Sequence, residues 1–206
     1  MPQDREEALT LELLNAIDAR SDVTQRHLAD RLGVALGLAN SYLKRCVRKG
    51  LVKITQAPAN RYLYYLTPQG FSEKTRLTAQ YLTASIDFYR HASGSLVAAL
   101  GQCRDAGHER VIFVGFSELA EIAAIRSHDL NIVVLGTYDP SGNWSTLFGK
   151  PVWQRLDALP PCDAAVLTAL NDCAARYAEV LPLLGPSRVI VPELVRPLLR
   201  LNEADA

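Results

Sequence analysis

The stretch "VTQRHLADRLGVALGLANSYLKRCVRKGLV", residues 23–52, decides the fold of the N-terminal part of the chain. Its apolar residues recur at the spacing of two helices, over 24–32 and 35–49. Gly33 lies between these segments and predicts a tight left-handed turn, and Gly50 predicts the end of the second helix. Two short helices joined by such a turn are typical of a helix-turn-helix.

Segments on both sides of this stretch extend the pattern. The segment "TLELLNAIDAR", residues 10–20, has apolar residues at helical spacing and predicts a preceding helix. The runs "LVKITQ" and "RYLYYLT" predict two strands joined by the turn "APAN", residues 57–60. Three helices followed by a hairpin predict a winged helix-turn-helix.

Charge is divided unevenly along a chain whose formal net charge is zero. From Arg20 to Arg76 there are 11 Lys/Arg and 3 Asp/Glu, a net of +8, which leaves 11 Lys/Arg and 19 Asp/Glu elsewhere, a net of −8. A split of this kind indicates two domains with different partners, one of them a polyanion. Together with the helix-turn-helix pattern, it predicts binding to double-stranded DNA.

The predicted helix over residues 35–49 carries the side chains that binding to double-stranded DNA requires. The major groove admits one helix, and the preceding helix braces it across the phosphate backbone. Asparagine can pair with adenine, lysine and arginine can contact phosphate or guanine, and a wing can reach the minor groove. The predicted DNA-binding residues are Gly37, Asn40, Ser41, Lys44, Arg45 and Arg48 on the helix, with Asn60 and Arg61 on the wing.

Three motifs in this part carry a family resemblance: "RHLADRLGVALGLAN", "KGLVK" and "YYLTPQG". Together, and in this order, they resemble the MarR-type winged-helix regulators associated with exopolysaccharide gene clusters. The resemblance covers Leu9 to Ala92 and implies a transcription regulator of polysaccharide-related genes. The chain continues for about another hundred residues, whereas those regulators usually end after a long helix.

That long helix is predicted over residues 71–108, with a bend or break near Gly94. It has two apolar stripes, which predict contacts with two bodies. One body is the winged helix, and the other is either a second subunit or the C-terminal domain. A homodimer would present two recognition helices to half-sites one duplex turn apart. The stripes are Leu77, Tyr81 and Phe88, and Leu82, Ile86 and Tyr89.

The remaining residues alternate between apolar strands and helices, which predicts a parallel sheet with right-handed crossovers. Strand-like runs are "RVIFVG", "LNIVVLGTYD", "KPVW", "CDAAVLTAL" and "SRVIVPE", and helices are predicted over 116–128 and 173–184. The predicted fold class is α/β, with an N-terminal winged helix-turn-helix and a Rossmann-like parallel sheet. The predicted domains are 1–70, 71–108 and 109–206.

The first strand-to-helix corner of such a sheet is a site for phosphate. Here the G-x-G-x-x-G pattern keeps its first glycine alone, Ser and Ala replacing the second and third. We expect a phosphate against the backbone amides of 116–119 and a ribose on the acid at the second strand end. That acid can instead simply begin a turn. The predicted ligand-binding residues are Gly115, Phe116, Ser117, Glu118, Asp139, Thr168 and Asn171.

A second resemblance rests on Asp139, the following "GKPV" at 149–152, and the runs "LDAL" and "DAAVLTAL". This order resembles the Rossmann-like domains of sugar-nucleotide-associated acyltransferases, CoA-binding proteins and the Rex redox-sensing repressors. The resemblance implies that the domain binds a nucleotide, a dinucleotide or a nucleotide-sugar.

Other function classes find less support in the sequence. No catalytic triad order and no nucleophile motif is found, so we expect no enzyme. The four cysteines and four histidines are scattered, so we expect no metal site. The first ten residues lack an apolar signal core, and no run is long enough for a membrane helix, so we expect a cytoplasmic protein.

Two alternatives to a ligand-controlled regulator remain. One is a sugar-nucleotide enzyme or accessory protein that uses the winged helix for docking. The other is a repressor without a ligand, whose α/β domain is structural.

Overall fold

The computed structural model describes residues 2–58, 61–142 and 144–201. The chain forms two compact units, Met1–Ile86 and Asp87–Ala206. The domain boundaries predicted at 70/71 and 108/109 remain predictions. No helix within the described residues is both long and apolar enough to cross a bilayer.

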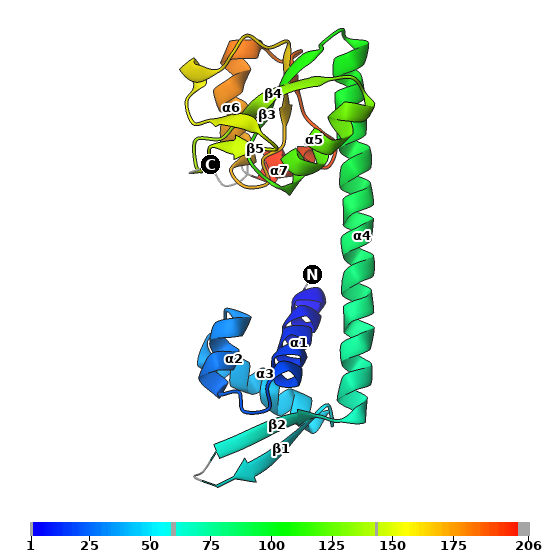
Figure 1. Cartoon of the computed structure of the whole chain (residues 1–206), viewed down its shortest axis with the longest axis vertical. Helices are drawn as coiled ribbons and strands as arrows, with labels where there is room; N and C mark the ends of the chain where they lie inside the picture. The colour runs from blue at the N-terminus through cyan, green and yellow to red at the C-terminus, as the bar shows by residue number, and fades with distance from the viewer. Residues whose placement is uncertain (1, 59–60, 143, 202–206) are drawn as a thin grey trace. The chain divides into compact units, whose positions relative to one another are not determined.

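The first unit has the predicted order of three helices and a hairpin, which confirms the winged helix-turn-helix. Figure 1 shows its three helices close to one another and to the hairpin. The strands of the hairpin are antiparallel, with Val52 opposite Leu66. The elements are α1 (Pro2–Ala19), α2 (Gln25–Leu32), α3 (Leu36–Arg48), β1 (Val52–Ala57) and β2 (Arg61–Leu66).

The turn between α2 and α3 follows from its capping residues. The Thr24 hydroxyl accepts a hydrogen bond from the His27 amide at 3.1 Å and caps α2. Gly33 ends α2 with φ +61°, where its amide donates to the backbone oxygen of Asp30. Leu28 on α2 and Leu43 on α3 are buried in a shared core with Leu14 of α1. This core leaves the opposite side of α3 in solvent.

Helix α4 (Pro68–Asp105) runs unbroken through both units. The alternative of a break at Gly94 is therefore wrong. A glycine inside a helix costs only about 0.5–1 kcal/mol relative to alanine. Burial of Ala92 and Leu96 on either side, both at 0% exposure, outweighs that cost.

The second unit is built on a six-stranded, mainly parallel sheet in the order β5-β6-β4-β3-β7-β8, which confirms the predicted α/β class. Strands β3, β4, β6, β7 and β8 are parallel, and β5 is an antiparallel edge strand that the sequence pattern did not predict. The strands are β3 (Arg110–Val114), β4 (Val133–Tyr138), β5 (Thr146–Leu147), β6 (Lys150–Trp153), β7 (Ala164–Leu167) and β8 (Val189–Ile190).

Helices α5 (Glu118–Asp129) and α6 (Cys173–Leu184) lie in crossovers that leave the sheet centre in opposite directions. Right-handed crossovers therefore place them on opposite faces of the sheet. The strand order reverses between β3 and β7, where the carboxyl ends of parallel strands leave a crevice. The short helices η1 (Leu156–Ala158) and α7 (Arg196–Leu201) complete the unit.

Candidate functional site

The outer side of α3 is the candidate DNA-binding surface. Ala39, Leu43 and Cys46 form its inner side, at 1–3% exposure. Gly37, Ser41, Lys44 and Arg48 are exposed on the outer side. The Ser41 hydroxyl donates to the backbone oxygen of Gly37 at 2.9 Å, so it is partly engaged within the helix.

Asn40 is less exposed than the other residues predicted to contact DNA from α3. Its side chain is half-buried, and its Oδ1 atom is buried with no hydrogen-bond partner among the described residues. A buried acceptor without a partner costs free energy. In this orientation Oδ1 faces the protein, so only the amide nitrogen is left for a base edge.

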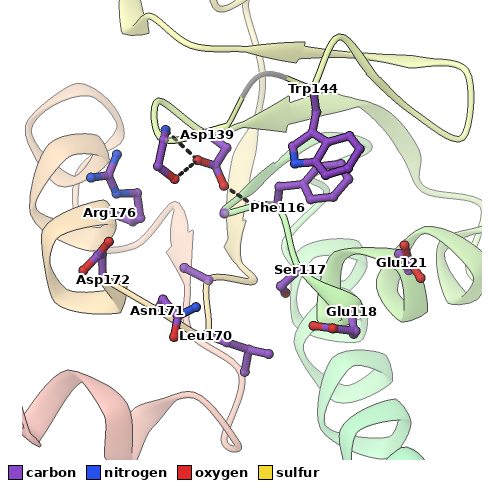
Figure 2. Close-up of a pocket in the computed structure, with 13 residues that line it drawn as sticks. Phe116, Ser117, Glu118, Glu121, Asp139, Trp144, Leu170, Asn171, Asp172 and Arg176 are labelled. Atoms are coloured by element: carbon purple, nitrogen blue, oxygen red, sulfur yellow. Dashed lines mark hydrogen bonds between the residues drawn. The ribbon is translucent and has the colours of Figure 1, made fainter. Parts of the chain in front are cut away.

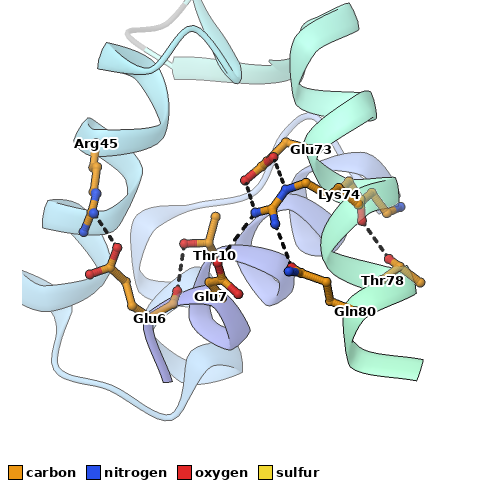
Figure 3. Close-up of polar contacts among 9 residues, drawn as sticks. Glu6, Glu7, Thr10, Arg45, Glu73, Lys74, Thr78 and Gln80 are labelled. Atoms are coloured by element: carbon orange, nitrogen blue, oxygen red, sulfur yellow. Dashed lines mark hydrogen bonds and ion pairs between the residues drawn. The ribbon is translucent and has the colours of Figure 1, made fainter. Parts of the chain in front are cut away.

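Arg45 is neutralised within the first unit. Its guanidinium forms an ion pair with Glu6 of α1, as Figure 3 shows. Lys74 pairs with Asp18 at 2.5 Å, and Arg76 with Glu73 at 2.8 Å. The net positive charge of this segment therefore overstates the charge available to a partner.

The cations that remain belong to the helix-turn-helix and the wing. Within the described residues these side chains form no ion pair: Arg26 on α2, Lys44, Arg48 and Lys49 on and after α3, and Lys53 and Arg61 on the wing strands. Arg61 is exposed at the start of β2, beside Tyr62, which is also exposed. The predicted wing residue Asn60 lies outside the described residues.

The second candidate site is a pocket of about 270 Å³ at the carboxyl ends of β3, β4 and β7. Figure 2 shows Phe116 and Trp144 on one side of it, and Asp172 and Arg176 on the other. Of the predicted ligand residues, Gly115, Phe116, Ser117, Glu118, Asp139 and Asn171 line it. Ala169 and Leu170, within the predicted wall of residues 168–171, line it as well. Residues that the sequence reasoning did not select also line it: Glu121, Ser141, Trp144, Asp172 and Arg176.

Gly115 is fixed by its surroundings. Its φ is +98°, which side-chain-bearing residues rarely adopt. A Cβ atom there would lie 2.4 Å from Cα of Ala169 on the neighbouring strand end. The glycine therefore lets β3 and β7 end close together.

Thr168 was predicted to line the pocket and does not. It is fully buried, and its hydroxyl donates to the backbone oxygen of Gly115 at 2.6 Å. The Ser117 hydroxyl in turn donates to the backbone oxygen of Thr168 at 2.5 Å and accepts from the Leu119 amide at 3.1 Å. Both hydroxyls hold the corner together beneath the pocket.

The predicted phosphate site is partly filled by the protein itself. Asp139 Oδ2 accepts from the Phe116 amide at 2.7 Å, and Ser117 holds the Leu119 amide. Two of the four amides expected to hold a phosphate thus already have partners. The rings of Phe116 and Trp144 stack at 5.1 Å between centroids, and this stack occupies the same corner (Figure 2).

Asp139 was predicted to bind ribose, but its carboxylate is already engaged. Besides Phe116, it accepts from the Ser141 amide at 2.9 Å and the Ser141 hydroxyl at 2.5 Å. Burial alone would raise the pKa of Asp139, but these hydrogen bonds and the charge of Arg176 lower it below its usual value. Asp139 is therefore an anion that ties the β4 end to the β3–α5 corner.

The pocket is acidic overall. Glu118, Glu121, Asp139 and Asp172 line it, against the single guanidinium of Arg176. The Arg176 side chain is 14% exposed, and its Nη1 lies 3.1 Å from Glu179 without the geometry of a hydrogen bond. Carboxylates in this excess disfavour a ligand with several phosphates.

Comparison with known protein families agrees with the winged helix-turn-helix fold of the first unit. Residues 7–53 match the family model described as winged helix-turn-helix DNA-binding. Among solved structures, the chain is similar to the PcaV transcriptional regulator from Streptomyces coelicolor (26% identity, 38% of this chain, 57% of that chain, TM-score 0.36). It is also similar to Streptococcus pneumoniae FabT in complex with DNA (24%, 38%, 55%, TM-score 0.32). The chain thus spans a little over half the length of these regulators.

Matches along more than nine tenths of the chain are to methyltransferases. Human N-acetylserotonin methyltransferase in complex with SAM matches at 12% identity (92% of this chain, 74% of that chain, TM-score 0.39). The O-methyltransferase NcsB1 with S-adenosyl-L-homocysteine matches at 18% (92%, 81%, TM-score 0.43). No curated protein matches the sequence.

These matches correct two expectations. The expectation that the chain is no enzyme is contradicted, because its chain-long neighbours are O-methyltransferases. The predicted resemblance of the second unit to acyltransferase, CoA-binding and Rex domains finds no support in these matches, which are to methyltransferases. The link to exopolysaccharide gene clusters finds no support in them. At these identities and TM-scores, the matches assign no reaction and no ligand to this chain.

Proposed function

We propose that the chain is a transcription regulator that binds double-stranded DNA with α3 in the major groove. The observation that carries this proposal is the winged helix-turn-helix with unpaired cations on its outer surface. Lys44 and Arg48 lie one helical turn apart and are exposed, so both can contact one phosphate backbone. Arg45 contributes less, because Glu6 already neutralises it.

Duplex binding by the full chain, measured over a range of salt concentrations, tests this proposal. Each phosphate contact adds about 0.9 to the slope of log affinity against log salt for duplex DNA. A steep slope, and tighter binding to a selected sequence than to random duplex, would support a regulator. Binding that is absent at low salt would contradict it and favour the docking alternative.

We further propose that the pocket at Gly115 holds a nucleoside without phosphates. Its four carboxylates disfavour phosphate, and the aromatic stack, in which Trp144 is exposed, can accept a base or a cation on its face. S-adenosylmethionine is a nucleoside with a sulfonium cation and suits this charge. It is therefore the first probe, ahead of dinucleotides, CoA and nucleotide-sugars.

Melting temperature with each of these probes tests the ligand proposal, because a ligand that binds the folded state raises it. In separate samples that contain S-adenosylmethionine and a phenol as the methyl acceptor, release of S-adenosyl-L-homocysteine is measured to detect methyl transfer. A shift with the phosphate-bearing probes alone would overturn the ligand class and leave DNA binding untouched.

We propose that the regulator is a homodimer that associates through α4. Large apolar side chains between residues 81 and 89 are exposed, Tyr81 at 63% and Leu82 at 54%. Leu77, predicted on the same stripe, is buried in the core of the first unit, in agreement with the predicted contact between this helix and the winged helix. Light scattering should show dimers, and Tyr81→Glu with Leu82→Glu should give monomers. Wild-type monomers at micromolar concentration would overturn this proposal.

A further inference from the structure

A second hollow lies on the α/β unit, away from Gly115, and it follows from the sheet topology. A parallel crossover normally carries a helix that covers one face of the sheet. The β3–β4 crossover carries α5, but the described part of the β4–β6 connection (139–142 and 144–149) holds only the short strand β5. Because both crossovers run in the same direction, the missing helix would lie beside α5.

The sheet face at that position is uncovered. Val134 on β4 is only half-buried and Ile125 on α5 is 51% exposed, although residues of parallel strands and their covering helices are normally buried. A register shift in β4 places Val134 and Thr137 on the same face as Val111 and Phe113 of β3. The result is a groove of about 740 Å³ with an apolar floor.

The size and lining of this groove suit a small molecule. Ligand sites commonly measure about 300–1,000 Å³ and are mostly apolar with few polar groups. Phe113, Ile132 and Leu147 form the buried part, and Phe148 stands at the rim with 61% exposure. Phe148 also has φ +48°, a strained backbone for a residue with a side chain.

The groove is lined by a cation and, in the part of the chain that the structure describes, by no anion. Lys150 and His128 line it, and no carboxylate does. Within the described residues, neither has an ion-pair partner. His128 lies in the last turn of α5, where the helix end disfavours an anion. An anionic group is therefore best placed at Lys150, with the His128 ring as a further donor.

We propose that this groove binds a carboxylate with a hydrophobic body, the carboxylate on Lys150 and the body against Phe113, Ile125 and Phe148. The site is separate from the pocket at Gly115, because no residue lines both. The proposal does not depend on DNA binding or on the nucleoside.

Calorimetry on the full chain tests it with matched pairs of probes. 1-Naphthoic acid is compared with 1-naphthamide, and decanoic acid with 1-decanol, so that each pair differs in charge and shares a body. We expect each acid that binds to bind about tenfold more tightly than its uncharged partner, which is the value of a charge-assisted hydrogen bond. The pair that binds more tightly shows whether the groove prefers an aromatic ring system or an aliphatic chain as the hydrophobic part of the ligand.

Two variants locate the site. Lys150→Met should remove the preference for the acid, and the control Lys53→Met, on the wing, should retain it. Ile125→Glu should abolish binding of both members of a pair, and near-ultraviolet circular dichroism checks that it folds. Failure of all four probes to bind, or equal affinities of Lys150→Met and Lys53→Met for the acids, would overturn the proposal. A dimer that Ile125→Glu dissociates, with no acid bound, would also overturn it and identify a second copy as the occupant.

Discussion

The outer face of α3 and the pocket at Gly115 are both built on a helix, α3 over its length and α5 at its N-terminus, yet their charges are opposite. On α3 the cations Lys44 and Arg48 are exposed and unpaired within the described residues. At the pocket, the first turn of α5 carries Glu118 and Glu121. A helix N-terminus attracts anions only if its amides are free and the nearby side chains do not repel them.

The corner of the α/β unit fails both conditions. Asp139 and Ser117 take two of its amides, and carboxylates surround the rest. The same corner geometry that holds phosphate in other sheets therefore serves here to join β3, β4 and β7. The contrast supports the two proposals made above, a polyanion for the first unit and a ligand without phosphates for the second.

Gly115→Val should disrupt the pocket corner, the second of the two regions compared, and should produce the largest effect of these variants. The new side chain meets Ala169 at 2.4 Å and requires a φ of +98°. Strain and overpacking together should cost about 3 kcal/mol or more of unfolding free energy. Both tryptophans lie in the second unit, so their fluorescence in a urea titration follows that unit alone.

Gly107→Ala is the matched control. Gly107 also has positive φ, at +75°, but the space around it is open, so the cost should be about 1–2 kcal/mol. Equal urea midpoints for the two variants would show that contact with Ala169 does not constrain the corner. Duplex binding should persist in Gly115→Val at temperatures where the first unit stays folded.

The double variant Lys44→Ala with Arg48→Ala should remove the positive charge of the outer face of α3, the first of the two regions compared. Loss of two phosphate contacts should flatten the salt slope by about two units and cost roughly 2–3 kcal/mol of duplex binding, whatever the sequence. Lys74→Ala is the control, because Lys74 pairs with Asp18 and should contribute little. An unchanged slope in the double variant would remove α3 as the DNA-binding helix.

Much of the fold could be predicted from local sequence, because its determinants are local. Thr24, Gly33 and the spacing of buried residues on α2 and α3 specify the helix-turn-helix. The segments "KPVW" and "CAARYAEVLPLL" coincide with β6 and α6. Strand β5 was missed because two residues are too few to show alternation.

The sites were harder to predict, because side-chain pairing depends on segments far apart in the sequence. Arg45 and Glu6 are on different helices, so the local charge count could not reveal their ion pair. Thr168 follows a strand like a pocket residue, but its hydroxyl turns to Gly115 in the core. Trp144 and Arg176 reach the pocket from loops and a helix that only the folded sheet brings together.

Asp139→Asn should sharpen the contrast by separating a structural role from ligand binding. The variant places an amide group against the Phe116 and Ser141 donors, which should cost about 2 kcal/mol of unfolding free energy at neutral pH. Because folding lowers the pKa of Asp139, its ionised form stabilises the wild type above the unfolded value of about 3.9.

That contribution is lost as the pH falls through the lower pKa of the folded state. The difference between wild type and Asp139→Asn, followed by tryptophan fluorescence in urea, should therefore shrink below about pH 4. A difference that stays constant with pH would show that the charge of Asp139 does not hold the corner.

Asn40→Ala should give the smallest effect and decides whether α3 contacts a base. No hydrogen bond to Oδ1 is lost, so the unfolding free energy of the first unit should change by less than about 1 kcal/mol. Since only the amide nitrogen can face DNA, the loss should be about 1 kcal/mol at one base pair, the lower end for asparagine on adenine. Competition among duplexes that each differ at one position would locate that pair.

Ser41→Ala is the control, because its hydroxyl is already bonded to Gly37. A uniform loss across all duplexes would instead mean that Asn40 shapes the surface of α3 and contacts no base.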